Sequence, residues 1–243
     1  MRQCLLSILV LVVTSSAGWT ACVDPSTLVR STVNIGRNFD EKERRAEPDV
    51  LGIRGTAWFL SPRLAVTAAH VADAMHLSVH DWREIDVQER ASQASLPARI
   101  LRVAGSQREK IAVLELGRPF PGATALRNRM EPLVPDEPLA SLAYPGSQLR
   151  FAGGRFVQYG DDAKFAGMAL LEMHDGNDRL VLDHGASGAP ILDCEGRVVA
   201  VVSTLITQTI AFASSPVRVS TAWQTPNVVS IPIEVLRDFS WPE

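Results

Sequence analysis

Short apolar runs, each interrupted by proline, glycine or polar residues, dominate this chain from Gly55 onward. In the first half they cover residues 56–60, 64–67, 85–87, 100–103 and 111–116. In the second half they cover residues 139–144, 155–159, 169–173, 189–192, 198–206 and 228–231. Runs of this length separated by turn residues are typical of strands in sandwiches or barrels. The sequence therefore predicts an all-β fold with a short closing helix at 233–239.

A proline-rich interval divides the predicted strands into two groups. Residues 118–138 contain five prolines, which exclude a continuous strand or helix there. We interpret this interval as the connection between two halves, at about 25–120 and 135–243. Before it, residues 28–35 are expected to form the first strand, and the charged run 40–47, followed by Pro48, an exposed loop.

The first residues have the pattern of a secretory signal peptide, which we assign to 1–21. Arg2 supplies a positive start, residues 5–13 are apolar, and small residues follow at 15–17. The apolar stretch is about half of the roughly 20 residues that a membrane-spanning helix needs. We expect an exported protein, periplasmic or secreted, without a membrane span.

Two cysteines remain after the predicted leader, Cys22 and Cys194. In an oxidising compartment they either pair or stay as free thiols, and the sequence leaves both alternatives open. Cys22 also follows Trp19-Thr20-Ala21, which distantly resembles a lipoprotein box, so a lipid anchor is a minor alternative. The net charge of −3, without a long run of one sign, gives no sign of a nucleic-acid partner.

Two motifs carry residues suited to nucleophilic catalysis. The first runs from Gly55 through Thr67-Ala68-Ala69 to His70, so it presents a histidine directly after a strand. The second is Gly185-Ala186-Ser187-Gly188. A serine hydroxyl needs a base to take its proton, and the oxyanion that forms needs backbone N–H donors, which residues 185 and 187 are expected to supply. A nucleophile elbow of the Gly-x-Ser-x-Gly type is disfavoured, because Ala189 stands at its last position.

Together, in the order His then Ser, these motifs resemble those of trypsin-like serine peptidases. The turn at 193–197 and the strand after it resemble the turn and substrate-binding strand of this family, and the ending at 227–233 resembles that of bacterial HtrA-like members. Too few residues follow Phe239 for a PDZ module. The resemblance implies a chymotrypsin-like fold of two six-stranded antiparallel β-barrels. It also implies His70 and Ser187 as the reactive pair and protein or peptide substrates, with no cofactor.

The third member of the triad departs from the family pattern. An Asp is expected directly before the Ile-Ala-Val-Leu strand at 111–114, where this chain has Lys110. A lysine cannot stabilise the imidazolium. Glu109, one position earlier, is the substitute we select, although a shift of one residue in a regular strand reverses the side-chain direction. Other candidate acids are Asp73, Asp81 and Asp86.

By the same resemblance, the first substrate pocket would have Val181 as its floor and Ser203 and Leu205 in its lining strand. These residues predict a small or medium apolar side chain at the cleavage site. The acid that precedes the serine in digestive members is replaced by Ala186, so activation through a new N-terminus is not expected.

The leading hypothesis is thus a serine endopeptidase. A catalytically impaired member that binds peptides through the same cleft is the main alternative, and an esterase of similar mechanism is a third. The remaining histidines lack any recognised zinc spacing, so no metal is expected. They are His76, His80, His174 and His184.

Overall fold

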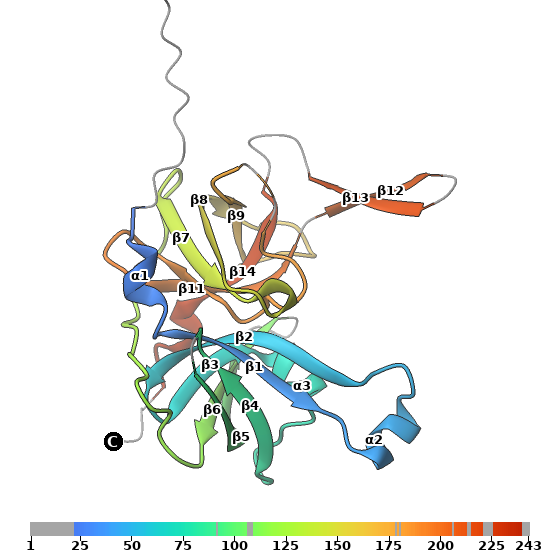
Figure 1. Cartoon of the computed structure of the whole chain (residues 1–243). Helices are drawn as coiled ribbons and strands as arrows, with labels where there is room; N and C mark the ends of the chain where they lie inside the picture. Colours follow the sequence, from blue (N-terminus) through green and yellow to red (C-terminus); the bar gives the residue numbers. More distant parts are fainter. Residues whose placement is uncertain are drawn as a thin grey trace, which may run out of the picture.

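The computed structural model describes residues 22–90, 92–105, 109–177, 179, 181–205, 207–212, 215–220 and 226–239, and in the segments between 205 and 220 it describes the backbone alone. The described chain forms two closed antiparallel β-barrels, one above the other in Figure 1. The predicted all-β, two-barrel fold is confirmed. The predicted leader, 1–21, lies outside the described residues, and no helix within the described part is both long and apolar enough to cross a bilayer.

The first barrel has six strands in the order β1-β2-β3-β6-β5-β4, closed by pairing of β1 with β4. The strands are β1 (Thr32–Asn38), β2 (Gly52–Ser61), β3 (Leu64–Ala68), β4 (Arg83–Gln88), β5 (Gln93–Gly105) and β6 (Lys110–Leu116). Its interior is apolar and includes Ile35, Phe59, Met75 and Leu114, each at most 1% exposed. Helix α3 (Ala69–Ala74) follows β3 directly at the rim.

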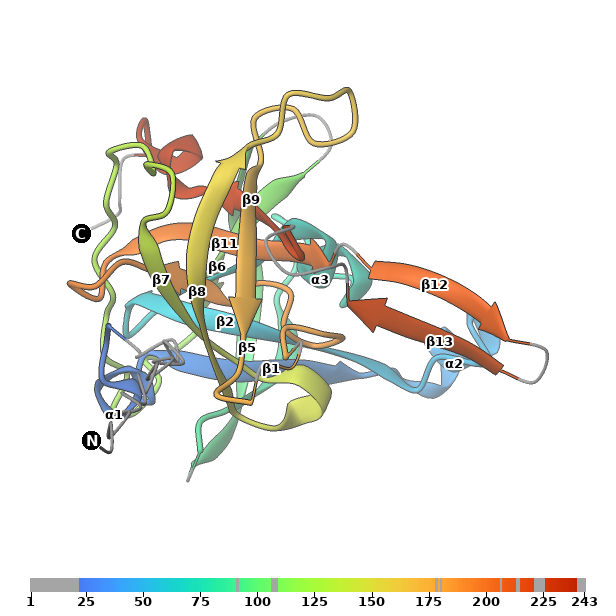
Figure 2. The ribbon, with the colours of Figure 1, turned by 90° about the horizontal axis from the view of Figure 1, so that it is seen from above.

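The second barrel repeats this design in the order β10-β11-β14-β9-β8-β7. Its strands are β7 (Pro138–Ala143), β8 (Arg150–Tyr159), β9 (Ala169–His174), β10 (Pro190–Leu192), β11 (Val198–Leu205) and β14 (Val228–Pro232). Between β11 and β14 the chain forms a separate two-stranded ribbon of β12 (Thr207–Phe212) and β13 (Ser215–Ser220). Figure 2 shows this ribbon projecting beyond the barrels, on the side of α3.

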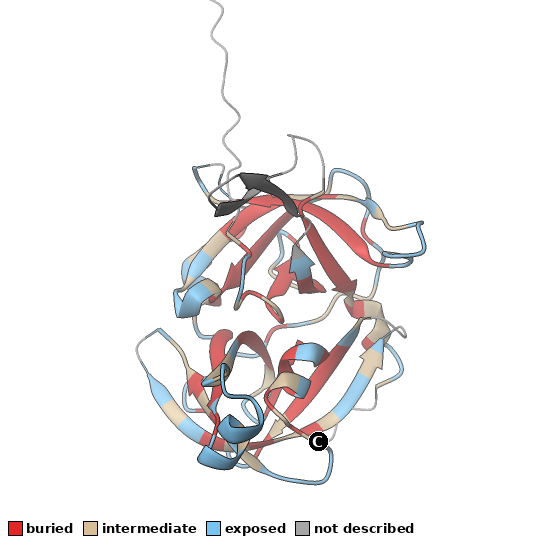
Figure 3. Ribbon diagram, turned by 90° about the vertical axis from the view of Figure 1, so that its right-hand side faces the viewer, coloured by how far each residue is buried: buried red, intermediate tan, exposed pale blue. Residues whose placement is uncertain are grey.

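Besides the apolar interiors of the barrels, a separate apolar cluster joins the two barrels. Alternate residues of a strand face opposite sides of a sheet. The side chains of Val66 and Val113 therefore point out of the first barrel and pack against the second. They pack with Trp58, Val201 and Ile231 in a single buried cluster. Figure 3 shows buried segments inside both barrels and where the barrels meet. Burial of this apolar surface stabilises the barrels as one unit.

The structure corrects several local predictions. Leu28 ends a short helix, α1 (Pro25–Leu28), and the first strand begins only at Thr32. The closing helix is a 3₁₀ turn, η2 (Ile233–Leu236), so it is shorter than predicted. The ribbon of β12 and β13 had no counterpart in the predicted strands.

The charged run at 40–47 is a helix, α2 (Glu41–Ala46), and the predicted loop is wrong. A capping box starts it: Glu43 donates its N–H to the Asp40 carboxylate at 2.8 Å, and Asp40 donates its N–H to the Glu43 carboxylate at 3.0 Å. Burial alone would raise the pKa of Glu43. Hydrogen bonds from the Asp40 amide, Arg37 and His76 outweigh it and lower that pKa to about 2.

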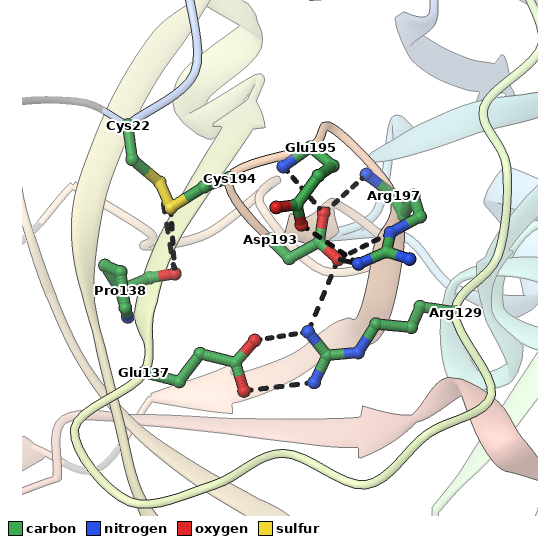
Figure 4. Close-up of a disulfide and its surroundings, with 8 residues drawn as sticks. All are labelled: Cys22, Arg129, Glu137, Pro138, Asp193, Cys194, Glu195 and Arg197. Carbon is green, nitrogen blue, oxygen red and sulfur yellow. Dashed lines mark hydrogen bonds and ion pairs between the residues drawn. A yellow bond between two sulfur atoms is a disulfide. The ribbon is translucent and has the colours of Figure 1, made fainter.

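Cys22 and Cys194 form a disulfide that ties the start of the described chain to the turn between β10 and β11 (Figure 4). The Cα atoms are 4.9 Å apart, although 172 residues separate them in sequence. Of the two alternatives left open by the sequence, paired or free cysteines, the structure has the pair. Beside it, the buried carboxylate of Asp193 pairs with Arg129 and Arg197, which holds the same turn.

Candidate active site

His70 lies in the first turn of α3, on the rim of the first barrel. The preceding strand β3 is buried along its whole length and ends at Ala68, directly before the helix. Gly55 lies against this helix, since a Cβ there would come within 2.5 Å of the Val71 side chain. The small residues of the histidine motif therefore allow close packing between β2 and α3, which fixes the position of His70.

The environment of His70 favours a neutral imidazole. His70 is exposed at the rim, yet the protein around its ring removes enough water to lower the pKa of His70 below its usual value. The negative charges of Glu109 and Asp73 act in the opposite direction and raise it. A neutral imidazole next to a carboxylate is the state that a general base requires.

Ser187 lies in a tight loop between Asp183 and β10. Gly185 and Gly188 have φ angles of +95° and +90°, which L side chains rarely adopt. A Cβ at residue 188 would also lie 2.1 Å from the Thr56 carbonyl oxygen. The glycines of the serine motif are thus needed for the loop to form against the first barrel. Ser187 is half-buried, and its hydroxyl donates to the Ser203 carbonyl at 3.0 Å.

Two backbone amides of this loop have no hydrogen-bond acceptor among the described residues, those of Gly185 and Ser187. The carbonyl of His184 accepts the Gly146 N–H at 2.9 Å. Because the C=O and N–H of a trans peptide point in opposite directions, this bond turns the Gly185 N–H away from Gly146. The arrangement offers two donors to an oxyanion.

Glu109, and not Lys110, provides the carboxylate near the histidine. Strand β6 starts at Lys110, whose side chain is exposed, so Glu109 precedes the regular strand and is free of its alternation. The buried hydroxyl of Ser203 donates to Glu109 Oε2, and the charge of Glu109 acts on His70. Hydrogen bonds therefore connect Ser187 to Ser203 and Ser203 to Glu109, and the charge of Glu109 acts on His70.

A sequence model described as a trypsin-like peptidase domain matches residues 55–201, more than half of the chain. The chain belongs to the trypsin-like peptidase family. The match begins in the histidine motif and extends past the serine motif, so it covers both motifs of this peptidase. No curated protein matches the sequence significantly.

Solved proteases share the fold of this trypsin-like peptidase at low sequence identity. The active form of the Rv3671c protease from M. tuberculosis superposes with a TM-score of 0.57 at 17% identity, over 88% of this chain and 80% of that one. Its inactive form gives 0.54 at 16% identity, over 87% and 88%. The HtrA-type protease AlgW, solved with a tripeptide, gives 0.54 at 15% identity, and this chain spans 58% of its length against 86% of its own.

The other candidate acids of this peptidase lie in different surroundings. Asp73 is exposed one turn after His70 on α3. Asp81 accepts the Ser78 hydroxyl at 3.3 Å, and Asp86 lies in β4 opposite Ser95. Of the three, only Asp73 affects the pKa of His70, and less than Glu109 does.

Ala186, directly before the serine, is fully buried in the core of the second barrel. Apolar packing therefore occupies the place where digestive members are expected to have an acid. No ion pair with a newly cut N-terminus can form at this residue.

The predicted pocket residues are only partly brought together. Val181 lines a shallow depression of about 410 Å³ beside the serine loop, together with Gly146 and Asp183. Ser203 is buried and contacts both Ser187 and Glu109. The backbone of Leu205 pairs with Val228 in β14, and its side chain lies outside the described part of the structure.

The remaining histidines lie in different surroundings. His76 pairs with Glu43 at 3.2 Å, and His174 Nε2 accepts a hydrogen bond from the Asn227 side-chain amide at 3.3 Å. His80 and His184 are exposed. Among the described residues, no group of three or more His, Cys, Asp or Glu side chains is arranged to hold a metal ion.

Proposed function

We propose that this chain is an exported serine endopeptidase that hydrolyses peptide bonds in proteins through Ser187 and His70. The observation that carries the proposal is the carboxylate of Glu109, which accepts the Ser203 hydroxyl and acts electrostatically on His70. It supports Glu109 in the orienting role despite Lys110. Membership of the peptidase family supports proteins or peptides as substrates.

In the proposed reaction, neutral His70 takes the proton of the Ser187 hydroxyl as its oxygen attacks the peptide carbonyl. The amides of Gly185 and Ser187 donate to the resulting oxyanion. His70 then gives the proton to the leaving amine. In the second half of the reaction, His70 takes a proton from water as the water attacks the acyl-enzyme, and returns it to the Ser187 oxygen. Glu109 stabilises the transient imidazolium. The Ser187 hydroxyl must first leave the Ser203 carbonyl to reach His70.

The proposed site for the substrate side chain is formed by Val181, Ser203 and Leu205. None of the three carries a charge, which supports a preference for small or medium apolar residues. Digestion of a peptide library gives the test, because a strong preference for Arg or Lys would contradict this part of the proposal.

Export to the periplasm or beyond is proposed from the leader-like residues 1–21. The disulfide between Cys22 and Cys194 supports it, because disulfides persist in oxidising compartments. Fractionation of cells that express the full chain tests this, and retention of the unprocessed chain in the cytoplasm would contradict it.

A peptide-binding protein without turnover is a second candidate, favoured by one observation. Ser187 donates to Ser203, and among the described residues no hydrogen bond joins Ser187 to His70. Labelling of the mature chain with a fluorophosphonate separates the two candidates, since the probe reports an activated serine without a known substrate. We expect labelling of the wild type and loss in Ser187→Ala and His70→Ala.

Absence of labelling in folded wild-type protein would instead favour the binding function. If labelling occurs, comparing hydrolysis of small esters with hydrolysis of denatured proteins decides between an esterase and an endopeptidase.

A further inference from the structure

Thr56, in the first barrel, makes a concentrated set of hydrogen bonds with the loop that carries Ser187. It is fully buried in β2. Its N–H donates to the Ser187 carbonyl at 3.0 Å, and its hydroxyl donates to the Gly185 carbonyl at 2.7 Å. The same hydroxyl accepts the Tyr144 N–H at 3.0 Å. A single side chain thus links three segments that are far apart in the sequence.

These bonds constrain the peptide groups on both sides of Gly185. The peptide before Gly185, which contributes its N–H to the proposed oxyanion site, is held by the bond from Gly146 to the His184 carbonyl. The peptide after Gly185 is held by Thr56 through the Gly185 carbonyl. A glycine with φ of +95° has low intrinsic resistance to rotation of its neighbouring peptides, so external bonds must fix them.

Thr56 also determines where the loop lies relative to His70. Its strand is the one whose Gly55 packs against Val71 of α3, next to the histidine. Its carbonyl accepts the Thr67 hydroxyl at 2.7 Å, which anchors it to the strand that leads to His70. The backbone of Thr56 is therefore tied to the His70 side of the site, and its side chain to the Gly185 side.

We propose that Thr56 is a positioning residue: it holds the peptide that follows Gly185 through the Gly185 carbonyl, and thereby limits the rotation at Gly185 that would turn its N–H away from the oxyanion. This inference rests on the proposed hydrolytic function and deepens it. Thr56 does not touch the substrate; it acts through the Gly185 carbonyl and the Tyr144 amide.

The test compares Thr56→Val with Thr67→Val in the mature, disulfide-bonded chain. Both changes replace a buried hydroxyl by a methyl of similar size and remove a hydrogen bond of 2.7 Å. Thr56→Val also removes the bond that this hydroxyl accepts from the Tyr144 N–H. Only Thr56 contacts the Gly185 peptide. We expect Thr56→Val to lower kcat at least about tenfold, the equivalent of one lost hydrogen bond, with KM changed by less than about twofold. Thr67→Val removes one hydrogen bond and is expected to lower kcat by less than about threefold.

Thr56→Ser keeps the hydroxyl and should restore kcat to within about threefold of the wild type. Thr56→Ala serves as the second variant if the valine variant does not fold, because it leaves room for water beside the Tyr144 amide. Unchanged kcat in Thr56→Val or Thr56→Ala would overturn the inference, as would an equal loss in Thr67→Val.

Amide hydrogen exchange separates this inference from the proposed function. The loop amides of Ala186, Gly188 and Ala189 are hydrogen-bonded and report the loop's conformation without any turnover. Faster exchange in Thr56→Val and Thr56→Ala than in Thr67→Val supports the positioning role, even for a wild type that hydrolyses nothing. Equal exchange in these variants would refute it, whereas an inactive wild type refutes the hydrolytic function alone.

Discussion

Replacing Glu109 by Gln tests the least conventional part of the site. The change keeps the shape of the side chain and removes its charge. Oε2 accepts the Ser203 hydroxyl, and the negative charge of the carboxylate favours the imidazolium of His70. Loss of the orienting acid in a known triad costs about 10⁴ in turnover. We expect kcat to fall by about 10³ to 10⁴, or roughly 4 to 5.5 kcal/mol at 1.36 kcal/mol per tenfold change.

The pH dependence gives an independent check of the same contact. His70 must be neutral to act as a base, so activity rises with pH through the pKa of His70, which burial lowers. The negative charge of Glu109 raises that pKa, so its removal should lower it further. The acidic limb of kcat/KM in Glu109→Gln is therefore expected at lower pH than in the wild type.

The assay is the second-order rate of fluorophosphonate labelling, with kcat/KM, from pH 4 to 9. Glu115→Gln removes a charge from β6, the strand that follows Glu109, and should change the rate less than about threefold, since Glu115 pairs with Arg99 at a partly exposed position. Adding Lys110→Asp to Glu109→Gln should not restore activity, because residue 110 is exposed. A Glu109→Gln rate within tenfold of the wild type, or rescue by Lys110→Asp, would refute the assignment.

Three further changes test other parts of the structure. Gly188→Ala should abolish labelling and lower stability by at least about 3 kcal/mol, since its methyl group would lie 2.1 Å from a carbonyl oxygen of β2. The control is Gly176→Ala, whose methyl group would meet nothing within 4 Å. Equal effects of the two changes in thermal unfolding would contradict the clash. Changing both Cys22 and Cys194 to Ser should lower stability by about 2 to 4 kcal/mol and make the melting temperature insensitive to reductant. A wild-type melting temperature that does not change with reductant would count against the disulfide. Glu43→Gln should cost about 2 kcal/mol at pH 7, measured by urea unfolding. The pKa of Glu43 is lower in the folded protein, so its contribution to stability is present above pH 4.5 and is lost as pH falls towards about 2. The loss of stability caused by Glu43→Gln should therefore shrink over that interval. A loss that stays constant with pH would refute the ion-pair account.

The barrels could be predicted from sequence because strand length and spacing are local properties. Each of the eleven short apolar runs predicted from Gly55 onward overlaps a strand of one of the two barrels. Residues 40–47 were misassigned because their charges suggested a loop, although Asp40 and Glu43 have the spacing of a capping box. The ribbon of β12 and β13 carries few apolar runs, so its pairing gave little local signal.

The site was predictable where it depends on short motifs and not where it depends on the fold. The small residues that flank His70 and Ser187 marked both as candidates. The structure explains why these neighbours are small: Gly55 and Gly188 lie in close contact with other segments. Glu109 could be nominated by position, but its preference over other acids rests on Ser203, 94 residues away in sequence. Thr56 was missed because its partners lie 88 and 129 residues away, and no local pattern marks a buried threonine with such contacts.

The ribbon of β12 and β13 also has a consequence for how the protein behaves at high concentration. Closed barrels expose no unpaired strand edge, and both barrels of the described chain are closed. In the described part, the ribbon pairs only within itself, so it offers free backbone N–H and C=O groups along its two outer edges. Aggregation by strand pairing between molecules should therefore start at this ribbon, and shortening it is the first change to make when the protein proves difficult to keep in solution.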